Sequence, residues 1–394
     1  MKKILLVSIA FPPKNDPESF QTAKYVKYLT KTNHVDVVTS KSPTLWMPFD
    51  EKLLAYIENV KQIISIRIIE PKYLSIFINK LVRRFVWPDT RLTFHLQYKK
   101  VIKQLKEKPD VIYSRAFPLS SILMAKKLKK HYNVPWVLHL SDPWLESPLF
   151  DYNKSKYHQK KEKECFDSAN VISFTSLSTI DIYKNKYPEY SYKYKYFPNV
   201  YDDEDIQDMP LKEGQSDIKI VYTGSLNGSR SLKMLIEAIN KIQKSKASIP
   251  YKIEVVVAGS LDSYNDKMIK ENSDFIKYVG FLSIVDVKEL QRSADILLAV
   301  DFDFKSSSDA IFFPSKLLDY FITKKPIIAI TTKNSTTDLL LKEIDHFCVY
   351  HNDSYSLIEL LLDLEEVTTK TYEIPTKYSA LNNVERLTNL FNEL

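Results

Sequence analysis

Glycine and cysteine are scarce in this sequence of 394 residues, which has five glycines and two cysteines. Because Cys165 and Cys348 are far apart, they provide neither a disulfide framework nor a cysteine metal site, and a reducing cytoplasm is the expected location. With so few glycines, the chain has no G-x-G-x-x-G fingerprint and no Walker sequence. No apolar run approaches the ~20 residues that span a bilayer. The seven histidines show no zinc-binding spacing.

The overall charge and the first residues exclude further classes. The net charge of +7 at pH 7 is mild for this length and does not indicate a nucleic-acid partner. The opening MKKILLVSIAFPP is superficially like a signal peptide. However, its apolar run is short, lacks a small-residue cleavage site and ends in Pro-Pro, so it predicts a buried first strand.

Apolar runs of strand length alternate with helix-like segments along the whole chain. The first series of predicted strands is Ile4–Ile9, Val35–Thr39, Ile64–Ile69, Val111–Tyr113, Trp136–Leu140, Val171–Phe174 and Tyr194–Phe197. The second is Ile218–Thr223, Ile253–Ala258, Ile276–Val279, Ile296–Val300, Ile327–Ile330 and His346–Tyr350. Predicted helices include Phe20–Thr30, Leu119–His131, Tyr157–Ala169, Leu232–Ser245, Ser283–Arg292 and Ser315–Thr323. This alternation predicts an α/β fold with parallel sheets covered by helices.

The two series predict two Rossmann-like domains. The first covers residues 1–202 and the second covers residues 218–375, with the acidic, polar stretch 203–217 as the linker. Residues 376–394 include a predicted final helix, a candidate to pack back on the first domain. Ligands of open α/β sheets bind beyond the carboxyl ends of the strands, so a site between the two sheets is expected.

Two segments place cations directly beside predicted strands. The strand Ile218–Thr223 opens into Gly224 and a short loop that carries Arg230 to the start of a helix. A glycine in this position lets a ligand approach the backbone. Later, the stretch FPSKLLDYFITKKPIIAI places Lys316 at a helix start and Asp319 one turn further on. Two cations near two helix N-termini are typical of a diphosphate site. The alternative is a surface turn with ordinary salt bridges.

The same segments resemble a known family. GSRSLKMLIEAI and FPSKLLDYFITKKPIIAI resemble the donor-binding segments of family-4 retaining glycosyltransferases with the GT-B fold. FPPKNDPESFQTAKYVKYL, HLSDPW, YFPNVYD and YVGFL are similar to further segments of that family, in the same order. The resemblance implies two Rossmann-like domains whose parallel sheets face an inter-domain cleft. It also implies transfer of a sugar from a nucleoside-diphosphate sugar with retention, without a required metal or a separate cofactor.

The resemblance also assigns roles to residues of the second domain. The implied donor-binding residues are Gly224, Ser225, Arg230, Phe281, Asp309, Ser315, Lys316 and Asp319. Arg230 and Lys316 would hold the diphosphate of a UDP-sugar or GDP-sugar, and Asp319 would hold the ribose. The sequence departs from the family at two positions. Ile311 stands where the family has an acidic residue, and Asp309 is the nearest substitute. Ser225 stands where the family has a cation.

Candidate residues of the first domain follow two predicted strands. His139 and Asp142 lie at and after the strand Trp136–Leu140, and with Arg230 and Lys316 they form the candidate catalytic set. Asp142 would orient or deprotonate an acceptor hydroxyl group. The alternatives are a buried core histidine and a turn cap before a proline. Asn15, Asp16 and Glu18 are candidate acceptor contacts, with a solvated loop as the alternative.

Other signals and alternatives remain open at this stage. Asp301 and Asp303 form an Asp-x-Asp tripeptide that other glycosyltransferases use for a metal, but nothing else in the sequence supports one. The basic, aromatic stretch 73–108 is typical of a helix on an anionic membrane surface, here the inner face of the cell membrane. A glycan or lipid-linked acceptor of bacterial surface polysaccharide synthesis fits this expectation. The alternative functions are a nucleotide-sugar epimerase of similar fold and a non-catalytic GT-B partner subunit that binds glycan or protein.

Overall fold

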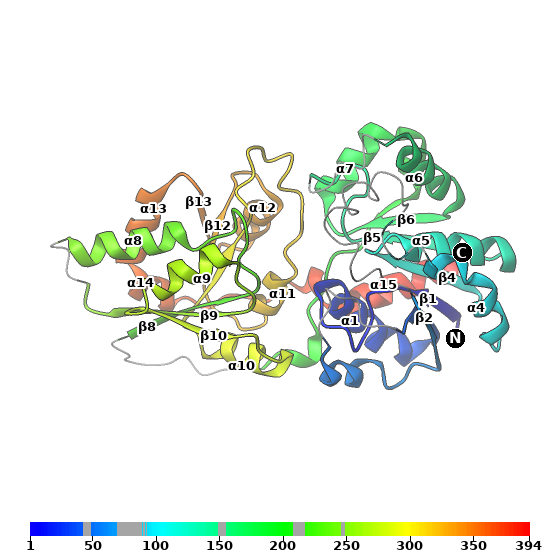
Figure 1. The fold of residues 1–394 in the computed structure, drawn as a ribbon, viewed down its shortest axis with the longest axis horizontal. Coiled ribbons are helices and arrows are strands. Elements are labelled where there is room, and N and C mark those ends of the chain that lie inside the picture. The colour runs from blue at the N-terminus through cyan, green and yellow to red at the C-terminus, as the bar shows by residue number, and fades with distance from the viewer. Residues whose placement is uncertain are drawn as a thin grey trace. The chain divides into compact units, whose positions relative to one another are not determined.

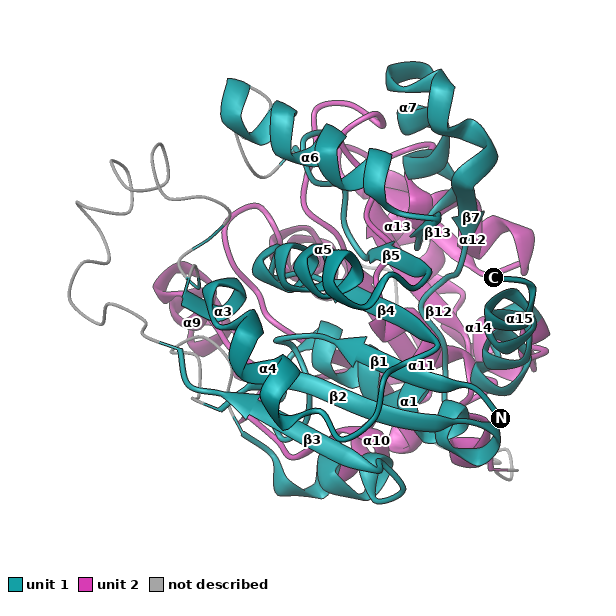
Figure 2. Cartoon of the chain, turned by 90° about the vertical axis from the view of Figure 1, so that its right-hand side faces the viewer, with its two compact units in different colours: residues 1–202, 377–394 teal, residues 203–376 magenta. Residues whose placement is uncertain are grey.

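The chain divides into two compact units, each with its own parallel sheet (Figure 2). The structure is a computed structural model, and we describe residues 1–41, 49–68, 89, 91, 93–148, 155–207, 217–245 and 249–394 of it. Unit 1 consists of Met1–Asp202 and Lys377–Leu394, and unit 2 consists of Asp203–Thr376. Much of the basic stretch 73–108, namely 73–88, 90 and 92, lies outside the described residues, and so does 208–216 of the predicted linker.

Unit 1 contains a seven-stranded sheet in the order β3-β2-β1-β4-β5-β6-β7. Its strands are β1 (Lys3–Val7), β2 (His34–Ser40), β3 (Gln62–Ile66), β4 (Val111–Ala116), β5 (Trp136–Leu140), β6 (Val171–Phe174) and β7 (Tyr194–Tyr196). All neighbouring strands are parallel. These strands lie on the predicted apolar runs, so the prediction of a parallel sheet is confirmed. The order reverses between β1 and β4, and such a switch point is where open α/β sheets bind ligands.

Helices cover both faces of this sheet (Figure 1). They are α1 (Pro17–Thr32), α3 (Thr93–Leu96), α4 (Tyr98–Gln104), α5 (Ser120–Tyr132), α6 (Lys156–Ser168), α7 (Leu177–Lys186) and α15 (Ala380–Glu393). One core cluster joins the sheet to α5 and α6, and another joins it to α1 and α15. The sequence determines where α1 begins, because the Asp16 side chain accepts from the backbone N–H groups of Glu18 and Ser19, and Pro17 takes the first helical position.

The last helix belongs to unit 1 although 174 residues of unit 2 precede it. Tyr201 and Ser379 form a parallel bridge, in which the Tyr201 N–H donates to Tyr378 at 3.0 Å and the Ala380 N–H donates to Tyr201 at 3.1 Å. Next to this bridge, Asp202 is buried and accepts from Lys27 and Tyr28 of α1. The chain therefore passes from unit 1 into unit 2 and returns to unit 1 at two neighbouring points.

Unit 2 contains a six-stranded parallel sheet in the order β10-β9-β8-β11-β12-β13. Its strands are β8 (Asp217–Thr223), β9 (Lys252–Ala258), β10 (Ile276–Gly280), β11 (Ile296–Val300), β12 (Ile327–Thr331) and β13 (Phe347–Tyr350). Its helices are α8 (Lys233–Lys244), α9 (Ser263–Lys270), α10 (Ile284–Ser293), α11 (Lys316–Phe321), α12 (Thr336–Glu343), α13 (Ser354–Leu362) and α14 (Leu364–Thr369). The switch point here lies between β8 and β11.

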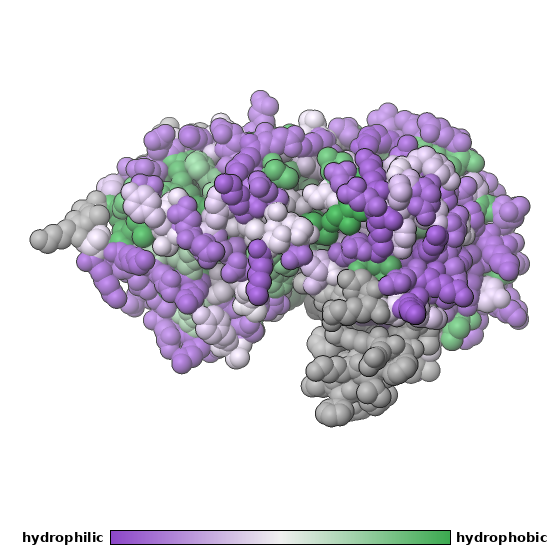
Figure 3. Space-filling model, turned by 90° about the horizontal axis from the view of Figure 1, so that it is seen from above, coloured by the Kyte–Doolittle hydropathy of each residue, from purple (hydrophilic) through white to green (hydrophobic). Residues whose placement is uncertain are grey.

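Hydrophilic side chains cover most of the face of the molecule that Figure 3 shows. Among the described helices, none is both long and apolar enough to cross a bilayer.

Candidate functional site

The carboxyl edge of the unit 2 sheet is built from closely packed backbone. Gly224 follows β8 and Gly259 follows β9, with φ values of +136° and +129°. A Cβ atom on Gly259 would lie 2.1 Å from the Gly224 carbonyl oxygen, so only glycine fits there. A Cβ atom on Gly224 would lie 3.1 Å from the Lys316 Nζ atom. The bare backbone of Gly224 therefore leaves room for the lysine ammonium group at the strand end.

Lys316 is held at this edge by an aromatic side chain. Its ammonium group lies 3.1 Å from the Tyr222 hydroxyl oxygen, which accepts its hydrogen bond, and 4.2 Å from the centroid of the same ring. Tyr222 is buried on β8 and donates to the Ser225 carbonyl at 2.9 Å. Burial of the ammonium group and the positive charge of Arg230 lower the pKa of Lys316 to about 7, while Asp301 acts in the opposite direction.

Arg230 reaches the same strand end from the loop after β8. Its guanidinium group lies 4.1 Å from the centroid of the Phe302 ring, which follows β11, and its buried Nε atom has no hydrogen-bond partner among the described residues. Arg230 and Lys316 interact electrostatically at this edge, because the charge of Arg230 adds to burial in lowering the pKa of Lys316. We call Tyr222, Gly224, Arg230, Phe302 and Lys316 the unit-2 site.

The helix that carries Lys316 is shorter than predicted. We expected Ser315–Thr323, but α11 covers Lys316–Phe321, and Ser315 is the residue before the helix, with helical dihedral angles and no side-chain capping hydrogen bond. Thr323 instead donates to the Tyr320 carbonyl in the turn that follows. Asp319 is half-buried in the first turn of α11.

The other predicted donor contacts lie on loops of the same unit. Ser225 accepts a hydrogen bond from Ser260 at 2.7 Å, and Phe281 is 62% exposed directly after β10. Asp309 lies in a turn in which its N–H donates to Ser306. Ile311, which stands where the family has an acid, is buried. The residue at position 311 therefore gives the site no polar group, and Asp309 stays the predicted substitute.

The Asp-x-Asp tripeptide has contacts of its own. The Asp301 side chain accepts from the Thr331 hydroxyl at 2.7 Å, and the Asp303 N–H donates to the Ser229 hydroxyl at 3.1 Å. Within the described ranges, no three His, Cys, Asp or Glu side chains gather as metal ligands would. The structure thus ties Asp301 to the next strand, β12.

In unit 1 a buried ion pair lies at the switch point. Arg115 at the end of β4 is fully buried, and its Nε atom donates to Glu18 of α1 at 2.9 Å. The guanidinium group also donates to the Tyr113 hydroxyl at 3.0 Å and lies 4.8 Å from the centroid of the Tyr25 ring. Its Nη2 atom lacks a partner in the described part of the chain. Burial raises the pKa of Glu18, against the opposing effects of Arg115 and a hydrogen bond from Ser141.

His139 lies beside Arg115 in the sheet and is fully buried. Its Nδ1 atom is 3.0 Å from the Ser173 hydroxyl on β6, whereas its Nε2 atom has no partner in the described structure. Burial, followed by the charge of Arg115, lowers the pKa of His139 well below its ordinary value, so the ring is neutral at pH 7. The structure supports the buried-histidine alternative, since the unpartnered Nε2 atom is itself buried, and the predicted catalytic role of His139 stays a prediction.

Asp142 follows β5, and hydrogen bonds of the preceding residue, Ser141, fix the loop in which it lies. Ser141 donates to Glu18, and the Ser141 carbonyl accepts from Thr175 at 2.6 Å. No hydrogen bond or ion pair from a described residue holds the Asp142 carboxyl group. Burial, and then the negative charge of Glu18, raise its pKa to about 7. Such a carboxyl group can take up or release a proton near neutral pH. We call Glu18, Arg115, His139, Ser141 and Asp142 the unit-1 site.

The remaining residues of the first loop have different surroundings. Asp16 caps α1, as described above, and also accepts from the Ser19 hydroxyl group. Its side chain is therefore committed to the helix start, and burial raises its pKa. Asn15 is half-buried beside it. The structure accounts for Asp16 without a ligand, while the predicted acceptor role of Asn15 stays a prediction.

Sequence reasoning missed four residues of the two sites, namely Tyr222, Phe302, Arg115 and Ser141. Arg115 gave no clear signal, because it lies two residues beyond the predicted strand Val111–Tyr113, whereas β4 continues to Ala116. Tyr222 and Phe302 gave none, since aromatic residues near strand ends are normally core residues.

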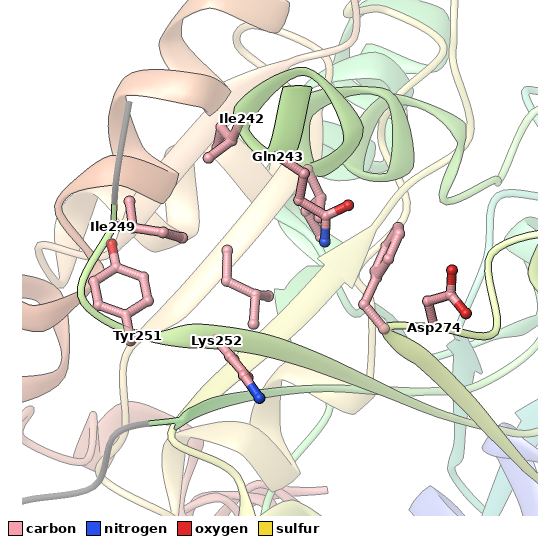
Figure 4. Close-up of a pocket in the computed structure, with 9 residues that line it drawn as sticks. Ile242, Gln243, Ile249, Tyr251, Lys252 and Asp274 are labelled. Carbon is pink, nitrogen blue, oxygen red and sulfur yellow. The ribbon is translucent and has the colours of Figure 1, made fainter. Parts of the chain in front are cut away.

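Unit 2 also contains a separate cavity of about 400 Å³, shown in Figure 4. It is lined by Ile239, Ile242, Gln243, Ile249, Tyr251, Lys252, Ile253, Asp274 and Phe275. Lys252 begins β9, so the cavity lies at the amino end of that strand, away from Gly224 and Lys316. Its lining is mainly apolar, and it is not part of the unit-2 site.

Comparisons with known proteins were made by sequence and by structure. No family model matches the chain, and no curated protein sequence matches it. Solved structures do match over the full length. HepE from Anabaena, solved with UDP and glucose, is 14% identical with a TM-score of 0.65, and all of both chains are covered. Sucrose-phosphate synthase from Thermosynechococcus elongatus is 13% identical with a TM-score of 0.67, covering 100% of this chain and 99% of that one.

A third structure with this fold carries a different description. A putative UDP-N-acetylglucosamine 2-epimerase from Listeria monocytogenes is 13% identical with a TM-score of 0.57, and 100% of this chain and 97% of that chain are covered. At these identities the likeness concerns the fold. Together with the two switch-point sheets, it establishes that this chain has the GT-B fold of two Rossmann-like domains.

Proposed function

We propose that the protein is a retaining glycosyltransferase that transfers a sugar from a nucleoside-diphosphate sugar without a metal. The observation that carries the proposal is the pair of cations at the end of β8, where Arg230 and Lys316 share a site with the bare backbone of Gly224. Two cations held together against their mutual repulsion favour a ligand with at least two negative charges. A diphosphate has this charge and fits the position at the switch point.

In this proposal the unit-2 site stabilises the leaving group. When the bond between the anomeric carbon and the β-phosphate oxygen breaks, negative charge grows on the diphosphate. Arg230 donates through its planar fork, and Lys316 acts as a point charge at the strand end. Since both are positioned before the reaction, they stabilise the transition state more than the ground state. Asp319 accepts from the ribose hydroxyl groups, and Phe281 is available to contact the base.

We assign the acceptor to the unit-1 site. Asp142 has a pKa of about 7 and no partner among the described residues, so it is suited to orient an acceptor hydroxyl group and take its proton. The free Nε2 atom of the neutral His139 ring would bind a sugar hydroxyl group. We propose that the acceptor is a glycan or a lipid-linked precursor of a bacterial surface polysaccharide. The transfer would take place in the cytoplasm or at the inner face of the cell membrane.

Calorimetry tests the donor site directly. With UDP, GDP and ADP titrated in EDTA, we expect one diphosphate to bind. Lys316→Met should weaken that binding tenfold or more, the value of about one charge-assisted hydrogen bond. Lys267→Met is the matched control, because this lysine is 77% exposed on α9. If no diphosphate binds, the non-catalytic subunit becomes the better description. Binding that requires magnesium would point to Asp301 and Asp303.

The pKa of Lys316 also predicts a pH dependence of donor binding. A bound diphosphate would raise this pKa, because it places negative charge against the ammonium group. Above pH 7 the free protein must therefore take up a proton on binding, and the affinity falls by up to tenfold per pH unit between about pH 7.5 and 9. Calorimetry in two buffers with different ionisation enthalpies counts this proton. If the affinity of the natural protein did not change with pH, as expected for Lys316→Met, Lys316 would not be a contact of the diphosphate.

The fold likeness to the Listeria protein favours one alternative, a nucleotide-sugar epimerase. An epimerase would use the same unit-2 site but convert the donor without any acceptor. Incubation of the protein with UDP-N-acetylglucosamine alone, followed by NMR of the sugar, distinguishes the two. A new sugar epimer still attached to UDP would replace the transferase proposal.

A further inference from the structure

Unit 1 has a lysine-rich groove between α5 and α6, which lie side by side (Figures 1 and 2). The groove has a volume of about 530 Å³ and is open to solvent. Its polar lining includes Lys126, Lys127, Lys129, Lys130, Lys161 and His95, and we call these residues the lysine groove. Its wall also includes Asn133 and Ser168, which come shortly before β5 and β6. It extends along both helices, from Leu123 and Tyr157 in their first turns to Asn133 and Ser168 at their far ends, and it contains no residue of the unit-1 site.

The positive charges of the lysines in this groove outnumber the negative charges of its lining. Glu164 is the one carboxylate among the described lining residues, and it pairs with both Lys126 at 3.0 Å and Lys161 at 2.7 Å. Lys127 donates to a backbone carbonyl at 3.3 Å, and Lys129 donates to the side-chain amide of Asn170. Both of these acceptors are neutral. Lys127 and Lys129 are both partly buried, and this burial lowers their pKa values, with a further effect of the charge of Lys193 on Lys129.

A buried histidine gives a second, independent observation. His95 of α3 is 6% exposed and lines the groove, and its Nδ1 atom has no partner within the described ranges. Burial, then Lys127 and Lys161, lower its pKa to about 4. A buried ring nitrogen without a partner loses the free energy of a hydrogen bond unless a ligand supplies one. An anion in the groove would interact with both the ring and the surrounding ammonium groups.

We propose that the lysine groove binds a phosphate-bearing anion. Several lysines around one cavity are suited to a dianion, since each contributes a point charge and none imposes the planar fork of arginine. Leu123 and the half-exposed Tyr157 add an apolar side to the cavity, so the ligand has an organic body in addition to its phosphate. A soluble sugar phosphate and an anionic lipid headgroup share this chemistry. The site is separate from the donor and acceptor sites proposed above.

The experiment uses His95 as a local probe in the full chain, in a Lys316→Met background that weakens phosphate binding at the unit-2 site. The imidazole proton signals of His95 are assigned by their loss in His95→Asn and followed by NMR against pH. Glycerol phosphate is one probe, and vesicles of phosphatidylcholine with and without phosphatidylglycerol are the other. We expect one probe to raise the His95 pKa by about one unit or more with saturation.

Charge-matched variants complete the test. Lys127→Gln with Lys130→Gln should weaken binding of the active probe at least tenfold. Lys160→Gln with Lys163→Gln removes the same charge from exposed positions of α6 outside the groove lining and should change little. A response to glycerol phosphate identifies a soluble phosphate ester as the source, and a response to phosphatidylglycerol vesicles alone identifies a lipid headgroup. An unmoved His95 pKa with both probes, or equal weakening by both variant pairs, would overturn the proposal.

Discussion

Lys316→Met is expected to lower kcat about 10²–10³-fold, the usual cost of removing one preorganised donor from a developing negative charge. Methionine keeps the length of the side chain but removes the ammonium group that lies 3.1 Å from Tyr222. The fold should be preserved, because Tyr222 retains its hydrogen bond to Ser225. In addition, burial lowers the pKa of Lys316, which means that the folded protein disfavours this charge and that its removal should not destabilise the fold. The measurement is turnover of the nucleotide sugar that calorimetry identifies.

Arg230→Met should act in the same direction and by a similar factor, since Arg230 shares the site with Lys316. The double variant should lose less than the product of the two single effects, because residues of one site are not additive. Lys267→Met again serves as the control and should keep full turnover. If Lys316→Met and Arg230→Met both turned over normally, the diphosphate would have to be bound elsewhere.

Arg115→Met should destabilise unit 1 by about 3–5 kcal/mol, because it leaves the mostly buried Glu18 carboxylate without its cation. Arg115 is fully buried and also donates to Tyr113, so two acceptors lose a donor at once. All four tryptophans of the chain lie in residues 1–202, so tryptophan fluorescence during urea unfolding reports on unit 1. Circular dichroism reports on both units. In Arg115→Met we therefore expect the fluorescence transition of unit 1 at a lower urea concentration than the unfolding of unit 2 seen by circular dichroism.

The double variant Arg115→Met with Glu18→Gln separates the pair from the packing. Removing both charges should restore most of the lost stability, because no unpaired buried charge remains. The pair Lys3 and Glu107 lies at the surface, 2.7 Å apart, and Lys3→Met should leave the urea midpoint nearly unchanged. If Arg115→Met were as stable as the natural protein, the buried ion pair would not hold the start of α1 to β4.

The strands were readable from the sequence because a parallel sheet buries both faces of each strand and leaves a continuous apolar run. β5 and β11 begin and end at the predicted residues. Helix ends were less certain. The predicted helix Ser315–Thr323 begins one residue before α11 and ends two residues after it. The buried Lys14 and Lys24 also break the apolar pattern of unit 1, and only the fold supplies the backbone carbonyls that receive them.

The candidate sites were readable only in part. The rule that ligands meet strand ends places Arg230 and Lys316 at one edge, and the structure brings them together there. Their roles in transfer stay predictions. Glu18 appeared as a loop residue in the sequence, since its partner Arg115 is 97 residues away and no local pattern links them. The same holds for Phe302 under Arg230, whose contact depends on the order of β8 and β11.

The bridge between Tyr201 and Ser379 has a consequence for the order of folding during synthesis. A ribosome makes residues 1–202 first, but the core around α1 also needs Ala380, Val384, Leu387 and Phe391 of α15. Unit 2, all of whose residues emerge before α15, can complete its own core earlier. The half made first should therefore be the last to become resistant to protease on a stalled ribosome, and it should wait with one apolar face uncovered until the final helix arrives.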